Sequence, residues 1–190
     1  MNEAVMKLQK TQLGFWLYLM SDIMLFATLF AVFQIQRNAT AGNVSGHDIF
    51  DLPYIFGETI LLLASSVSAG IAWMAAEAKK VRVFRWLLIL TVLLGLGFLI
   101  MELSEFARLA ADGHSWQASG FLSAYFTLVG THGLHISVGI IWAVTLLVMV
   151  WLRGLDHNFV RKIGLFTLFW HFLDLVWIFI FTVVYLMGAS

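Results

Sequence analysis

The sequence predicts an all-α fold, a polytopic membrane protein built as a bundle of five transmembrane helices. Of the 190 residues, 61% are hydrophobic and only 12% are charged, whereas charged residues make up about 25% of an ordinary soluble domain. A chain of this composition has too little polar surface to cover itself in water. It also contains apolar runs that reach the length of about 20 residues that a helix needs to cross the hydrocarbon. We therefore expect residues 1–190 to form a single membrane domain.

Each span is justified by its apolar run and the residues around it. The first run follows "MNEAVMKLQKTQLG" without a small-residue cleavage site, so we expect a membrane helix and not a cleaved signal. The second opens at Pro53, which is tolerated in the first turn of a helix. The third is "FRWLLILTVLLGLGFLIMELS", and the fourth is long enough to tilt or to project beyond the bilayer. The expected helices are residues 14–36, 53–76, 84–104, 119–152 and 163–187.

The distribution of Lys and Arg predicts the orientation in the membrane. The N-terminus and the segments 77–85 and 153–162 together carry nine of the 11 Lys and Arg residues, and the segments 37–52 and 105–118 carry the other two. Segments that face the cytoplasm are enriched in Lys and Arg. We therefore expect the N-terminus to lie in the cytoplasm and the C-terminus outside.

Composition also excludes several classes of function. The formal net charge is zero, so nothing points to a nucleic-acid partner. There is no cysteine, which rules out disulfides, thiolate metal sites and a cysteine nucleophile. Any chemistry must therefore come from His and carboxylate side chains.

Eight such side chains lie inside the expected spans or at their ends. An ionisable group in the membrane costs at least a few kcal/mol, so each is a candidate functional residue. The eight residues are Asp22, Glu58, Glu102, Glu105, His132, His135, His171 and Asp174.

The spacing of these residues predicts a shared polar cluster. His132 and His135 are three positions apart, as are His171 and Asp174, and residues at this spacing share a helix face. Asp22 and His171 each lie about eight residues, roughly 12 Å, from the cytoplasmic ends of their helices. We therefore expect a buried polar cluster that joins the first, fourth and fifth spans.

Three interpretations of this cluster are open. Imidazoles bind iron, copper or zinc, and carboxylates orient them, which would make a metal or haem site. A chain of Asp, Glu and His can instead carry protons, although no ladder of polar residues crosses the whole membrane. Polar side chains also join helices in lipid, for about 1 kcal/mol each. The small-residue segment 64–70, with Gly130 and Gly133, favours this structural interpretation because it lets helices approach closely.

Several segments resemble a known family. They are "YLMSDIMLFATLFAVF" at 18–33, "GTHGLHISVGIIW" at 130–142 and "WHFLDLVWIFIFTVVYLMG" at 170–188, together with "LLLASSVSAGIAW" and "ELSEF". This combination resembles subunit III of the haem–copper oxidases over nearly the whole chain. Within that family it looks most like the cytochrome o ubiquinol oxidase branch, which has five spans and an N-terminus inside.

The resemblance implies a non-catalytic subunit of a proton-pumping complex in the bacterial cytoplasmic (inner) membrane. In this family haem b, haem o and copper lie in subunit I, and ubiquinol oxidation and oxygen reduction to water occur in the complex. Subunit III packs with subunits I, II and IV and stabilises subunit I. It holds phospholipid in a cleft, expected here between the first two spans and the last three. Asp22 matches a family carboxylate, here one methylene shorter, which can influence proton uptake into subunit I.

Four other functions are considered beside this one. An accessory protein of nitric oxide reductase also resembles subunit III, and subunit III of a cytochrome c oxidase belongs to the same family. An independent haem-binding cytochrome b anchor predicts a b-type absorbance in the isolated chain. A small transporter is disfavoured because the sequence shows no inverted repeat and no broken helices.

Overall fold

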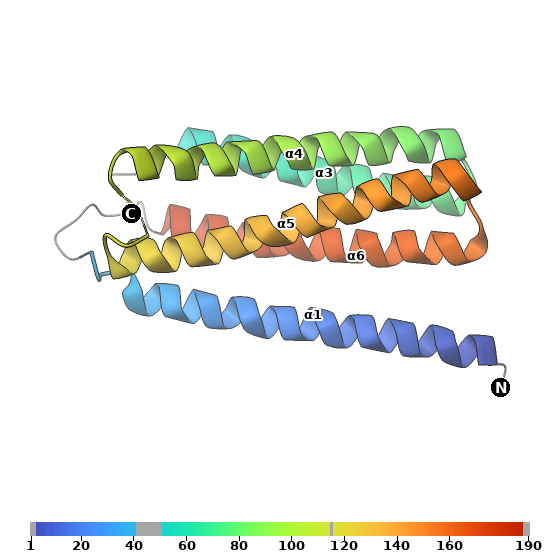
Figure 1. The fold of residues 1–190 in the computed structure, drawn as a ribbon, viewed down its shortest axis with the longest axis horizontal. Helices are drawn as coiled ribbons and strands as arrows, with labels where there is room; N and C mark the ends of the chain where they lie inside the picture. The colour runs from blue at the N-terminus through green and yellow to red at the C-terminus, as the bar shows by residue number, and fades with distance from the viewer. Residues whose placement is uncertain (1–2, 41–50, 115, 188–190) are drawn as a thin grey trace.

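The computed structural model describes residues 3–40, 51–114 and 116–187 and is helical apart from short turns. Five long helices run side by side along the long axis of the molecule (Figure 1). This confirms the expected all-α architecture. The elements are α1 (Glu3–Gln36), α3 (Leu52–Glu77), α4 (Val81–Ala111), α5 (Gly120–Arg153), α6 (His157–Ile180) and a π-helical extension of α6, η1 (Phe181–Leu186).

All five long helices are long and apolar enough to cross a membrane. Their most apolar stretches have mean hydropathies between 1.7 and 2.4. α1 begins well before the apolar run of the first span, and α4 continues past the third run to Ala111. Backbone hydrogen bonding continues a helix where the side chains turn polar, so helices extend beyond the hydrocarbon that selects their apolar part.

Local sequence signals define the helix ends. Pro53 lies in the first turn of α3, where a missing N–H costs nothing. The Ser119 hydroxyl caps α5 by accepting from Leu122 N, and Asp156 caps α6 by accepting from Phe159 N at 2.7 Å. Gly154 follows the last residue of α5, and its φ of 74° is favourable only for glycine.

The five long helices form a group of four and one helix beside it. α3 packs closely against α4 and also against α6, and α5 lies against both α4 and α6. α1 contacts mainly α5 and only touches α6, so it runs along one side of the other four (Figure 1). The expected division of the first two spans from the last three is therefore wrong. The second span, α3, belongs to the four-helix group, and α1 alone stands beside it.

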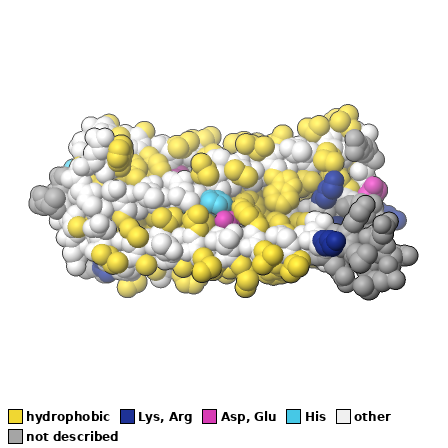
Figure 2. All heavy atoms as spheres, turned by 60° about the horizontal axis from the view of Figure 1, so that its bottom comes forward, with side chains coloured by type: hydrophobic (Ala, Val, Ile, Leu, Met, Phe, Trp, Pro, Cys, Tyr) yellow, Lys and Arg dark blue, Asp and Glu magenta, His cyan; other side chains and the backbone are white. Residues whose placement is uncertain are grey.

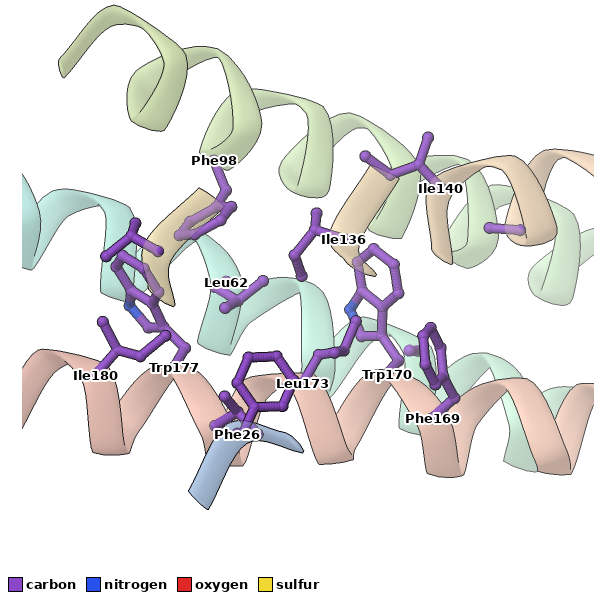
Figure 3. Close-up of a cluster of buried hydrophobic side chains, with 14 of the residues drawn as sticks. Phe26, Leu62, Phe98, Ile136, Ile140, Phe169, Trp170, Leu173, Trp177 and Ile180 are labelled. Carbon is purple, nitrogen blue, oxygen red and sulfur yellow. The ribbon is translucent and has the colours of Figure 1, made fainter. Parts of the chain in front are cut away.

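Aromatic side chains fill the middle of the bundle (Figure 3). Trp170 and Trp177 of α6 are buried, and their indole N–H groups donate to Ser65 Oγ and Thr59 Oγ1 of α3, each at 3.0 Å. Trp170 also lies against Gly139 of α5, where an added Cβ would come within 2.7 Å of the indole ring. These contacts fix α6 between α3 and α5. They therefore also fix the position of each polar residue of α6 along the length of the bundle.

Candidate functional site

The eight residues singled out in the sequence do not form one cluster. The structure distributes them over a pair between α1 and α5, an acidic group between α3 and α4, a group between α3 and α6, and His132 in the core. Asp22 is paired with His135, and no hydrogen bond or ion pair joins it to His171 in the described part of the chain. The expected meeting of Asp22 and His171 is therefore not seen.

Asp22 and His135 link α1 to the four-helix group. Asp22 Oδ2 lies 3.6 Å from His135 Nε2, and His135 Nδ1 lies 2.7 Å from the carbonyl oxygen of Thr131. A carbonyl only accepts, so Nδ1 carries the hydrogen and Nε2 faces the carboxyl group. Figure 2 shows a histidine and an acidic side chain side by side midway along a largely apolar face. Inside a bilayer the hydrophobic effect does not drive helices together, so a polar pair at this position helps to hold the two helices in contact.

His132 points elsewhere than its neighbour His135. Its ring is fully buried and stacks on Trp177, with ring centroids 5.3 Å apart, and Phe98 meets it edge-on at 5.9 Å. Residues three apart on a helix differ by about 60° in direction. That difference turns His132 into the aromatic core and His135 toward α1. The imidazole of His132 is therefore enclosed by aromatic side chains of α4 and α6.

Glu58, Glu102 and Glu105 are 2% exposed or less. The hydroxyl of Tyr185 donates to Glu105 Oε2 at 3.2 Å and lies 3.0 Å from the hydroxyl of Tyr125. Five of the six carboxyl oxygens are buried without a hydrogen-bond partner. Within the described residues, no group of three or more His, Asp or Glu side chains is arranged to hold a metal ion.

His171 has a partner that sequence reasoning missed, Ser66 of α3. His171 Nδ1 lies 2.5 Å from Ser66 Oγ, and Asp174 follows three residues later on α6. Nε2 of the imidazole lies next to Gly70 of α3, where an added Cβ would be at the contact distance of 3.5 Å. The sequence signal available for this contact was the small-residue segment 64–70, which contains Ser66. It predicted close packing of helices but not a hydrogen bond between a serine and a histidine.

A cleft of about 530 Å³ opens between α1, α3 and α6, and His171 lies at its inner end. Trp16 of α1 and Trp73 of α3 line its walls, and Arg161 and Lys162 lie near the start of α6. Glu77, at the C-terminal end of α3, lines the same end, so this end carries two cations against one carboxylate, and the rest of the cleft is mostly apolar. Sequence reasoning missed it because it depends on where α1 lies relative to α6.

Comparison with known proteins gives consistent results. The chain matches the family described as "Cytochrome c oxidase subunit III" over residues 2–189. It is 49% identical to "Cytochrome bo(3) ubiquinol oxidase subunit 3" of Pseudomonas aeruginosa over 180 residues, 94% of this chain and 86% of the relative. It is 44% identical to "Quinol oxidase subunit 3" of Bacillus subtilis (94% and 87%) and 43% identical to "Cytochrome c oxidase subunit 3" of Bacillus sp. strain PS3 (93% and 85%).

Proposed function

Because the chain belongs to the cytochrome c oxidase subunit III family, we propose that it is subunit III of a ubiquinol oxidase. The enzyme is the complex, and this chain is an accessory subunit of it. The observation that carries the proposal is the high identity, over nearly the whole chain, to relatives named as subunit 3 of ubiquinol oxidases. A relative named for cytochrome c oxidase is also similar, so the electron donor is the part that experiment must test.

The contacts of the polar residues support an accessory role. Asp22 binds His135 across α1 and α5, Ser66 binds His171 across α3 and α6, and Tyr185 binds Glu105 across η1 and α4. Each of these contacts joins two helices. The three contacts lie apart from one another and do not form a shared site. We infer that haem b, haem o and copper lie in subunit I, and that this chain supports subunit I in a complex with subunits II and IV.

The cleft supports the proposal that the subunit holds phospholipid. Arg161 and Lys162 lie within the first few residues of the α6 span, the depth of a bilayer headgroup, and the walls beyond them are mostly apolar. A phosphate would meet the two cations at the mouth of the cleft while the acyl chains run along Trp16 and the outer side of α1. The phospholipid would then cover the mouth of the cleft and stiffen the attachment of α1.

The same cations support the proposed orientation in a bacterial inner membrane. The start of α1 and the end of η1 lie at opposite ends of the bundle (Figure 1). The end where α1 begins also holds the α3–α4 turn with Lys79 and Lys80 and the start of α6 with Arg161 and Lys162. By the positive-inside rule this end faces the cytoplasm, and the C-terminus lies outside.

Affinity purification of the tagged chain in a mild detergent tests the proposed function. We expect a large haem–copper subunit I and a quinol-oxidase subunit II to co-purify in equal amounts, with ubiquinol-dependent oxygen consumption that pumps protons in vesicles. Co-purification with nitric oxide reductase subunits, or activity with cytochrome c in place of ubiquinol, would refute it. A coloured chain recovered alone would indicate that it binds haem itself.

A further inference from the structure

The inner end of the cleft carries a hydroxyl group that the fold does not use. Thr167 is 2% exposed, lines the cleft, and its Oγ1 has no hydrogen-bond partner. Other helical threonines in this chain, such as Thr59 and Thr127, donate to the carbonyl oxygen one turn earlier. A buried hydroxyl without a partner is destabilising, so an occupant that accepts this hydrogen bond would gain affinity.

His171 lies one turn beyond Thr167 and also lines the cleft. Ser66 of α3 engages its Nδ1 at 2.5 Å. The second ring nitrogen, Nε2, is therefore left for contacts outside this group, and the side chain is solvent-accessible in the isolated subunit. Ser66 holds the ring in one orientation, which is the arrangement expected of a binding residue that must be pre-positioned.

Depth distinguishes these two groups from the cations at the mouth. The α6 span runs from Phe159 to Leu186. At about 1.5 Å per residue, Arg161 lies roughly 3 Å, Thr167 roughly 12 Å and His171 roughly 18 Å along it. The hydrocarbon core is about 30 Å thick. A phospholipid with its phosphate at Arg161 therefore presents acyl methylenes at His171, and methylenes accept no hydrogen bond.

We propose that the inner end of the cleft binds the head of a membrane quinone or quinol. Such a molecule carries ring oxygens on a body apolar enough to enter the middle of the bilayer. One oxygen would accept from Thr167 Oγ1, and the oxygen across the ring or a ring substituent would pair with His171 Nε2. The volume of about 530 Å³ is within the range of small-molecule sites, and Trp73 lines the wall as an aromatic surface for the ring.

The inference concerns binding and requires no electron transfer on this chain. It rests on the proposed function in one respect, that the complex oxidises ubiquinol and so operates in a membrane that contains it. A phospholipid ester carbonyl offers the same acceptor chemistry, and the experiment must separate the two sources. The depth of His171 favours the quinone.

Photolabelling tests the proposal. Purified complex is illuminated with an azido-ubiquinone, and labelled peptides are identified by mass spectrometry. We expect label on this chain around Trp73 and residues 164–171, removed by excess ubiquinone and retained with excess phospholipid. Thr167→Val keeps the side-chain shape and removes the hydroxyl, so it should lower the label about fivefold, the equivalent of one hydrogen bond. His171→Leu should lower it at least as much.

Thr145→Val is the matched control, because Thr145 is exposed on α5 and bonds to its own helix; its label should equal wild type. Label on other subunits serves as an internal standard. The proposal is overturned if this chain takes no label, if phospholipid displaces the label as well as ubiquinone does, or if Thr167→Val leaves it unchanged. Failure of the proposed function would show separately, as a tagged chain that purifies without oxidase subunits and can still be labelled.

Discussion

At the scale of single residues, close approach of helices depends on glycines that face large rings. Gly139 of α5 faces Trp170, and an added Cβ would lie 2.7 and 3.0 Å from two indole carbons and 3.3 Å from Phe169. The indole is buried and tied to Ser65, so it has little freedom to move away. Gly14 of α1, in contrast, has nothing within 4 Å of an added Cβ.

We therefore predict that Gly139→Ala destabilises the subunit by about 1 to 3 kcal/mol, the usual cost of overpacking a filled core. Thermal unfolding of the purified complex, followed by loss of this subunit from the assembly, measures the effect. Gly14→Ala is the control and should unfold at the wild-type temperature. Equal stability of the two variants would show that α5 and α6 are not packed as described.

A second residue-scale prediction concerns Asp22. Its carboxyl group faces His135 at 3.6 Å, and it belongs to no group of metal-binding geometry among the described residues. Asp22→Asn keeps the shape and removes the negative charge that faces His135 between α1 and α5. We expect initial oxygen consumption close to wild type and a shorter active lifetime during turnover. Immediate and complete loss of activity in an intact complex would instead indicate a direct part in the reaction.

At the scale of helices, α1 is held to the group mainly through one face. Phe26 is 2% exposed and its ring lies 5.3 Å from His135, 6.4 Å from His132 and 6.4 Å from Phe172. This aromatic contact and the neighbouring polar pair attach α1 to α5 and α6. α1 is thus the helix whose attachment single substitutions should weaken most.

Phe26→Ala should therefore loosen α1 selectively. We expect faster proteolysis within residues 3–40 of the detergent-solubilised complex, because α1 detaches more often, while α3 to α6 stay protected. Leu17→Ala, at an exposed position on the same helix, should leave the cleavage rate unchanged. Uniformly faster cleavage along the chain would mean that α1 unfolds only together with the other helices.

Sequence patterns were sufficient to predict the five helices. They were insufficient to predict which helices pack against each other. Apolar length selects membrane spans directly, so the five helices could be predicted. The spacing of His132 and His135 indicated a common face but not the angle that sends one to the core and the other to α1. Which helix lies opposite depends on the packing of neutral residues such as Gly139 and Ser66, and these carry no signal in a search for charged groups.

At the scale of the whole molecule, orientation can be tested without background labelling, because the chain has no cysteine. Single cysteines replace Lys79, in the α3–α4 turn, and Asp112, at the C-terminal end of α4. Intact spheroplasts treated with an impermeant maleimide should label Asp112→Cys and leave Lys79→Cys unlabelled until the membrane is opened. The opposite pattern would invert the proposed orientation.

The central claim is that this chain supports an oxidase complex and carries no redox centre of it. The most direct measurement compares haem and copper content per subunit I in complexes purified with and without this chain. We predict identical content and a similar initial rate of ubiquinol oxidation, followed by faster inactivation in the complex that lacks it. Loss of one haem in proportion to loss of this chain would contradict the account and place a cofactor among its histidines.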